Sequence, residues 1–279
     1  MIKRGIQNKK AQVTLFIIIA IVVVAVAALV VVLWPRISGL FMSKQQAQNY
    51  LATQSIELRN AIADCIKNIS EGAFYKMGLQ AGYYDTTGLK TLYFIDKDYV
   101  VVMFKDASSQ RINKLPTLSQ IENEYQLFLA AEGNEALDKC INLDSFKRKM
   151  NIEAGERKIN AMIYPDSIVL NVDWPMKLSK PTTQGTAEQE INQKQVLLLI
   201  PLGYLWQTAN TIVDCETRVD CNYEGIEWDK DTWNNPLRLQ YISKEARSLN
   251  KDQIVFILES MPYRPGELPY KFNFAIDRS

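Results

Sequence analysis

The 279-residue chain contains no histidine. Histidine most often supplies the general base, the triad member or the metal ligand near neutral pH, so its absence removes the commonest forms of such sites. The sequence also lacks a glycine-rich phosphate loop with a Walker lysine. Ser248 and Lys251 match the Ser-x-x-Lys spacing of some acyl enzymes, but no companion motif accompanies them. We expect no catalytic residue, no metal and no cofactor, and we do not predict an enzyme.

Charge is nearly balanced, with 32 Lys and Arg against 31 Asp and Glu. The two signs are interspersed, so no basic face suggests nucleic acid, and we expect no nucleic-acid partner. Carboxylates stand close together at Glu122 and Glu124 and at Asp229 and Asp231. A glycosidase needs two carboxylates that face one sugar, which spacing cannot establish. A tethered hydrolase is therefore the least supported class of function.

One apolar run dominates the N-terminal region. Residues 13–34 are 22 consecutive positions at which only Thr14 is polar. About 20 residues of helix cross a bilayer core, whereas a cleaved secretory signal has an apolar region of only about 7–15 residues. We therefore predict a transmembrane helix over 13–34, with the lipid bilayer as its partner.

Basic residues precede this run and predict its orientation. Four of them lie before it with no acidic residue: Lys3, Arg4, Lys9 and Lys10. This excess predicts a cytoplasmic N-terminus. The expected organisation is a single-pass protein of the cell membrane. It has a basic leader over 1–12, the helix over 13–34, a linker over 35–42 and an extracytoplasmic domain over 43–279 that could divide near residue 150.

Four cysteines, Cys65, Cys140, Cys215 and Cys221, fall in the predicted extracytoplasmic part, where disulfides can form. Four cysteines allow three pairings. Cys65 and Cys140 each come late in a predicted helix, and Cys215 and Cys221 flank a short polar loop. We favour Cys65–Cys140 and Cys215–Cys221 over the other pairings and over free thiols. A zinc site would normally include histidine or a Cys-x-x-Cys pair, and neither is present.

Residues 43–77 are predicted to form one long helix that ends at Gly78. A stripe at alternating spacings of four and three residues runs along it: Leu51, Ser55, Leu58, Ile62, Cys65 and Ile69. This stripe favours a helix that lies on its own domain, and a coiled coil is the alternative.

Two more helices are expected later in the chain. Pro116 begins one, with a capping-box pattern at Ser119 and Glu122 and a break near Gly133 before it ends at Cys140. The other follows Pro201 and ends near Cys215.

β-rich runs alternate with these helices. Two hairpins are expected, 91–95 with 99–104 and 158–164 with 167–174, and single strands at 195–200, 253–258 and 270–276. Residues 180–195 are polar and are expected to form an exposed loop or arm. Helices and hairpins come in blocks, so the predicted class is α+β with antiparallel sheet.

Three surface features are candidates for contact or modification. Trp228 and Trp233 lie in an acidic stretch and could stack on a sugar or a partner, although a small hydrophobic cluster under the loop is favoured. Asn68 heads the Asn-Ile-Ser sequon for glycosylation.

The N-terminal region carries a family resemblance. Lys9-Lys10-Ala11-Gln12-Val13-Thr14-Leu15-Phe16 resembles the start of archaeal type IV prepilins. It looks more closely like the start of uncharacterised single-span archaeal envelope proteins, which have a similar Cys-bearing helix followed by a string like Gly78-Leu79-Gln80-Ala81-Gly82-Tyr83. The resemblance implies leader cleavage between Ala11 and Gln12. Many prepilins carry Glu where Phe16 stands here.

These observations predict a membrane-anchored structural or adhesive protein of the cell surface, such as a pilin-like filament subunit. Its partners would be copies of itself or other envelope proteins. Ala20 and Ala27 are small residues near one helical face, and small residues permit close helix packing in lipid. The alternative is a bitopic accessory or ligand-binding subunit of a membrane complex.

Overall fold

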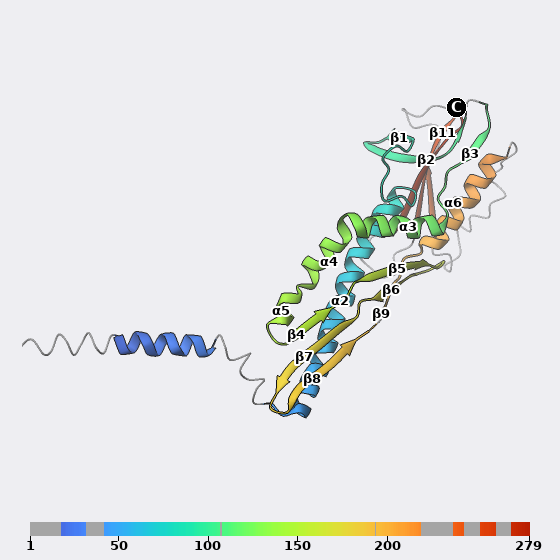
Figure 1. Cartoon of the computed structure of the whole chain (residues 1–279). Helices are drawn as coiled ribbons and strands as arrows, with labels where there is room; N and C mark the ends of the chain where they lie inside the picture. Colours follow the sequence, from blue (N-terminus) through green and yellow to red (C-terminus); the bar gives the residue numbers. More distant parts are fainter. Residues whose placement is uncertain are drawn as a thin grey trace, which may run out of the picture. The chain divides into compact units, whose positions relative to one another are not determined.

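Helices and strands are both abundant in the chain, and its computed structural model has an α+β fold (Figure 1). The structure describes residues 18–31, 42–106, 108–192, 194–218, 252–260 and 269–279, and the backbone alone of 237–242. The chain divides into two compact units. The first comprises residues 1–59, 142–155 and 175–191, and the second comprises residues 60–141, 156–174 and 192–279.

The transmembrane helix predicted over 13–34 is not seen. In the described residues the apolar run forms a helix over 18–31 only. Among the helices that the structure describes, none is both long and apolar enough to cross a membrane. This element of the predicted fold is therefore wrong. The leader over 1–12 and the remaining positions of the predicted span lie outside the described residues.

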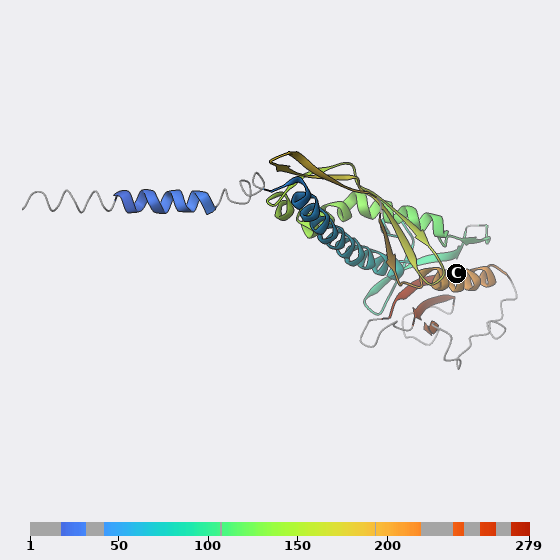
Figure 2. The same ribbon diagram turned by 90° about the horizontal axis from the view of Figure 1, so that it is seen from below.

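The long helix predicted over 43–77 is confirmed as α2 (Lys44–Leu79), which has 36 residues. Figure 2 shows it as one unbroken coil. The predicted stripe is buried along α2 except at its last position, which is half-buried: Leu51, Ser55, Leu58, Ile62, Cys65 and Ile69. Because these side chains are buried within a single chain, the stripe is a core-facing surface of α2.

Gly78 has a different role from the predicted one, since α2 continues past it to Leu79. The chain leaves the helix through Ala81 and Gly82, whose φ angles are 57° and 96°. Only the left-handed region contains such angles, and glycine adopts them without a steric cost.

The first unit contains the N-terminal part of α2, the short helix α5 (Leu143–Lys147) and a three-stranded antiparallel sheet. The sheet order is β4-β7-β8, with β4 (Asn151–Ala154), β7 (Met176–Thr182) and β8 (Gly185–Ile191). The arm predicted over 180–195 is therefore wrong, since most of it pairs in the β7–β8 hairpin. Pro181 fits in β7 because the pairing with β4 stops at Ser179, so its missing N–H has no ladder partner to lose.

The second unit contains a three-stranded antiparallel sheet of order β5-β6-β9, with β5 (Lys158–Ile163), β6 (Ile168–Asp173) and β9 (Lys194–Leu198). The predicted hairpin over 158–174 is confirmed. Helix α3 (Leu118–Phe128) covers the edge of β5. Glu122 accepts a hydrogen bond from the Ile163 N–H at 3.0 Å, and Gln126 donates one to the Ile159 carbonyl at 2.8 Å. These bonds satisfy backbone groups that an edge strand leaves unpaired.

A true capping box begins α3, but at other residues than predicted. Thr117 is the N-cap, and its partner is Gln120. The break expected near Gly133 is a π-helix, η2 (Leu129–Gly133), followed by α4 (Asn134–Ile141). A β-carbon on Gly133 would press against the Phe128 ring, so the residue fits this tight turn only as glycine.

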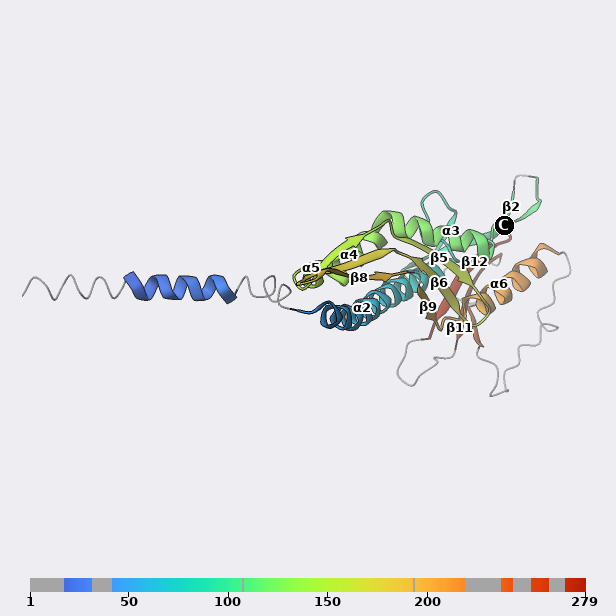
Figure 3. The same ribbon diagram turned by 60° about the horizontal axis from the view of Figure 1, so that its bottom comes forward.

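The second unit also holds a six-stranded sheet of order β1-β2-β12-β11-β10, with β3 beside β2. Its strands are β1 (Thr91–Phe94), β2 (Lys97–Lys105), β3 (Arg111–Asn113), β10 (Leu237–Ile242), β11 (Gln253–Ser260) and β12 (Lys271–Asp277). The β1–β2 hairpin confirms the prediction. β2 and β12 are parallel, contrary to the antiparallel expectation. They are far apart in sequence, so no local turn pattern specifies the direction of this pairing. The predicted helix after Pro201 is α6 (Leu202–Thr217), which packs against this sheet (Figure 3).

Candidate functional site

The helix over 18–31 is the largest candidate interaction surface. All of its residues are exposed, and it contains only Ile, Val, Ala and Leu. Its large side chains are between 44% and 72% exposed: Ile18, Ile19, Ile21, Val22, Val23, Val24, Val26, Leu29, Val30 and Val31. Soluble monomers rarely expose a continuous apolar patch of this kind, so the helix is a candidate interaction surface.

Small residues lie along one side of this helix. Ala20 and Ala27 are seven residues apart, which is almost two full turns, so they lie near one face. Val24 falls between them on the same side, while Val22 and Ala25 lie on the opposite side. The predicted pair therefore offers a strip where a second helix could approach closely.

The disulfide predicted between Cys65 and Cys140 is confirmed. It joins α2 to α4 across 75 positions of sequence, with the two Cα atoms 5.8 Å apart. Cys215 is also disulfide-bonded, and its predicted partner Cys221 lies outside the described residues. No cysteine in the described residues is a free thiol.

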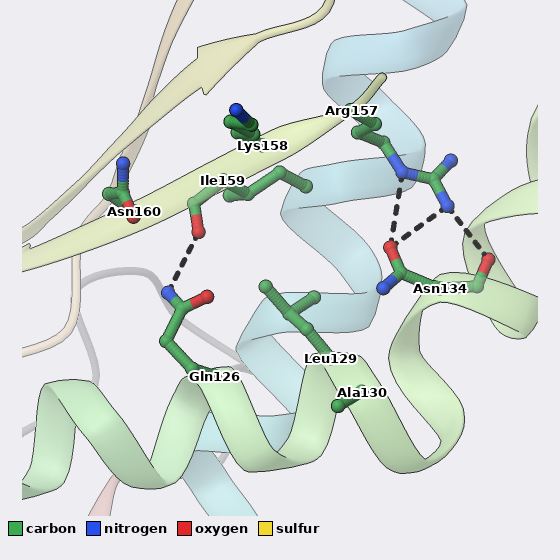
Figure 4. Close-up of a pocket in the computed structure, with 8 residues that line it drawn as sticks. All are labelled: Gln126, Leu129, Ala130, Asn134, Arg157, Lys158, Ile159 and Asn160. Carbon is green, nitrogen blue, oxygen red and sulfur yellow. Dashed lines mark hydrogen bonds between the residues drawn. The ribbon is translucent and has the colours of Figure 1, made fainter.

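A cavity of about 240 Å³ lies between the α3–η2–α4 segment and the start of β5 (Figure 4). Leu129 and Ala130 of the π-helix line it, together with polar side chains. π-helical turns are rare and frequently occur at functional sites, which makes this cavity a candidate. The volume suits a small molecule of a few heavy atoms, or several waters.

Arg157 lines this cavity, but its guanidinium already donates hydrogen bonds to other residues of the protein. It donates to the Asn134 side-chain oxygen from Nε at 3.2 Å and from Nη2 at 3.0 Å, to the Asn134 carbonyl at 3.0 Å, and to Asp138 at 2.9 Å. It also lies 4.8 Å from the centre of the Trp174 ring. Figure 4 shows the Arg157 side chain turned toward Asn134. These bonds fasten β5 to α4, so Arg157 is a structural clamp and has little capacity left for a ligand.

A larger cavity, of about 660 Å³, lies elsewhere in the second unit. The turn after α2, strands β2 and β3 and the first turn of α3 enclose it. Tyr83, Lys90, Phe104 and Lys114 line it beside aliphatic side chains. The Tyr83 hydroxyl donates to the Lys114 carbonyl at 2.8 Å, which links two of these lining segments.

Buried charges near the C-terminus are paired with one another. Glu216 is buried and accepts a hydrogen bond from Arg278 Nε at 2.7 Å. Asp277 accepts one from Lys90 at 2.8 Å. Burial opposes ionisation of Asp277, but the bonds from Lys90 and Ser279 outweigh it, so the pKa of this carboxyl lies below its usual value. Because each carboxylate is neutralised by a neighbouring cation, we assign the two ion pairs a structural role.

Glu122 and Glu124 contact different segments of the chain. Glu122 accepts from the Ile163 N–H and Glu124 from the Tyr84 N–H, so both hold backbone groups. The described residues contain no cluster of metal-binding side chains.

Of the other predicted site residues, one lies in the part of the chain that the structure describes and the rest do not. Asn68 is exposed on α2. Trp228, Trp233, Asp229, Asp231, Ser248 and Lys251 lie outside the described residues, as do Ala11 and Gln12. The two cavities were not predicted, since their walls come from segments distant in sequence. The polar residues next to Gly133 were the one available signal for the smaller cavity.

Comparison with known proteins gives no relative for this chain: no family model matches it, and neither a curated protein nor a solved structure is similar to it.

Proposed function

We propose that this protein is a structural or adhesive subunit of the cell surface, assembled through its apolar helix over 18–31 into a pilin-like filament or appendage. The observation that carries this function is the exposure of every residue in that helix. Burying apolar surface contributes roughly 25 cal/mol per Å², so packing with a second copy would stabilise the assembly substantially.

The rest of the chain supports this role. An apolar helix followed by the Cys-bearing helix α2 and the string from Gly78 to Tyr83 is what the resemblance to archaeal envelope proteins implies. The disulfide between Cys65 and Cys140 favours a location outside the cytoplasm, because thiols in the cytoplasm are generally kept reduced. The exposed sequon at Asn68 suits the same location.

A second candidate is a ligand-binding subunit of a larger surface complex. The cavity of about 660 Å³ favours it, since ligand pockets are commonly about 300–1,000 Å³. The two roles are compatible, because the cavity and the apolar helix belong to different units.

Assembly and location can be tested on the full chain in the cells that produce it. We expect large assemblies by sedimentation and by electron microscopy, and we expect lysines of the folded domain to react with a membrane-impermeant amine reagent on intact cells. Deleting residues 18–31 should abolish the assemblies and leave the Cys65–Cys140 disulfide intact. Monomeric full-length protein, or lysines protected until the cells are lysed, would contradict this function.

A further inference from the structure

We propose that the larger cavity of the second unit binds a small organic anion with an apolar body, such as an aromatic carboxylate. This cavity is separate from the clamp around Arg157, and its assignment does not depend on assembly through residues 18–31.

The walls of the cavity supply the apolar contact. Leu115, from the segment before α3, and Phe104 of β2 are half-buried and line it. Val100 and Val101 of β2 border it too, but at 3% and 4% exposure they offer a ligand little surface. Polar groups share the walls with these apolar residues, and small-molecule pockets combine apolar contact with a few placed polar groups.

The charged side chains that line the cavity are both lysines, and no carboxylate lines it. Lys90 is neutralised by Asp277 at 2.8 Å and lies 5.2 Å from the centre of the Phe104 ring. Lys114 differs, because within the described residues its ammonium takes part in no ion pair. A ligand anion would give Lys114 the counter-charge that Lys90 already has.

The backbone around Lys114 is fixed on both sides. Its N–H donates to the Val102 carbonyl at 2.6 Å, and its carbonyl accepts from the Tyr83 hydroxyl at 2.8 Å. A lysine presented from a fixed backbone loses less conformational freedom on binding than one on a loose loop. Lys114 therefore supplies the charge that orients the anionic group of the ligand, and the apolar side chains contact the body of the ligand.

Binding can be measured on the full chain kept dispersed in detergent micelles, by titrating it with benzoate and following backbone amide NMR shifts at Tyr83, Val101 and Lys114. We expect saturable shifts confined to the cavity. Benzyl alcohol, which keeps the ring without the charge, and acetate, which keeps the charge without the ring, should both bind more weakly. Lys114→Gln should weaken benzoate binding about five-fold, the upper range for one partly exposed ion pair. Lys97→Gln, at an exposed lysine of the β1–β2 hairpin, should leave it unchanged.

A cavity-filling variant tests the apolar half of the site. Leu115→Trp should abolish benzoate binding, provided that the amide spectrum elsewhere shows a native fold. Equal affinities of Lys114→Gln and the wild type, equal affinities for benzoate and benzyl alcohol, or shifts that never saturate would each overturn the assignment.

Discussion

Gly78 of α2 lies so close to Lys271 of β12 that a β-carbon at position 78 would overlap the Lys271 carbonyl oxygen. The Tyr270 hydroxyl, which donates to the Phe74 carbonyl, is the next neighbour. We expect Gly78→Ala to destabilise the protein by about 1–3 kcal/mol, because backbone cannot move away as easily as a flexible side chain. Urea denaturation followed by circular dichroism measures the change.

Gly72 is the matched control on the same helix. A β-carbon there would meet nothing within 4 Å, so Gly72→Ala should stabilise the protein by about 0.5–1 kcal/mol through helix propensity. The two substitutions are chemically identical and have opposite expected signs. Changes of the same sign would show that α2 does not contact β12 as described.

The disulfide between Cys65 and Cys140 closes a loop of 75 positions. In the loop-entropy model, such a bond stabilises the folded state by about 4 kcal/mol. The double variant Cys65→Ser/Cys140→Ser should therefore unfold at a much lower urea concentration than the wild type, and a reductant should have a similar effect on the wild type. Non-reducing peptide mapping provides the check, and free thiols at both positions in protein from cells would refute the bond.

Arg157 should contribute to stability through its fork of hydrogen bonds to Asn134 and Asp138. Arg157→Lys keeps the charge but cannot reproduce this planar set of donors or the contact with Trp174. We expect a loss of about 1–2 kcal/mol in the free energy of unfolding. Lys158→Ala, at the next and exposed position, should change stability by less than about 0.5 kcal/mol. Equal effects of the two substitutions would show that the clamp is unimportant.

Tyr125 makes stability sensitive to alkaline pH. It is fully buried, stacks on Phe74 at 4.8 Å and shares a hydrogen bond of 2.7 Å with Ser70. Burial raises the pKa of Tyr125 to about 12, against a partly opposing effect of the Ser70 bond. The unfolded chain loses this proton near pH 10 and the folded chain near pH 12, so the contribution is complete below pH 10 and is lost between these values.

A shift of about two pKa units corresponds to about 3 kcal/mol. Tyr125→Phe should be less stable at pH 7, since Ser70 loses its partner, but its stability should fall less steeply between pH 10 and pH 12. Urea midpoints at pH 8, 10 and 11 compare the two slopes, and the other tyrosines cancel in the difference. Parallel slopes would contradict the buried, protonated state of Tyr125.

Local patterns allowed much of the fold to be predicted. The stripe from Leu51 to Ile69 predicted α2 because helical periodicity is a short-range signal, and turn residues predicted the β5–β6 hairpin for the same reason. The β7–β8 hairpin was missed because its buried face includes the polar residues Lys180 and Thr182. The sequence there therefore does not alternate between apolar and polar residues. The parallel pairing of β2 with β12 depends on tertiary context that no local pattern records.

The candidate sites were less predictable for a related reason. Cys65 and Cys140 could be paired because they lie in the similar strings Asp64-Cys65-Ile66 and Lys139-Cys140-Ile141. Neither cavity has such a local signature. Lys114 and Tyr83 become neighbours only when β3 and the turn after α2 come together. Hydropathy also identified the apolar helix over 18–31, but the transmembrane helix predicted over 13–34 is not seen in the described residues.

Assembly through the apolar helix depends on small residues. If copies pack along the side that carries Ala20 and Ala27, two helices can approach closely there, and dispersion contacts increase steeply as the helix axes come together. Ala20→Leu/Ala27→Leu should disrupt the assemblies, because the added side chains hold the helices apart. The matched control, Val22→Leu/Ala25→Leu, enlarges the opposite side of the same helix and should assemble normally. Both variants keep the helix apolar, so a loss specific to the alanine pair cannot arise from reduced hydrophobicity. Sedimentation of the two variants and of the wild type measures whether each of them forms assemblies. Normal assembly of the alanine variant would move self-association to another face of the helix or into the folded units.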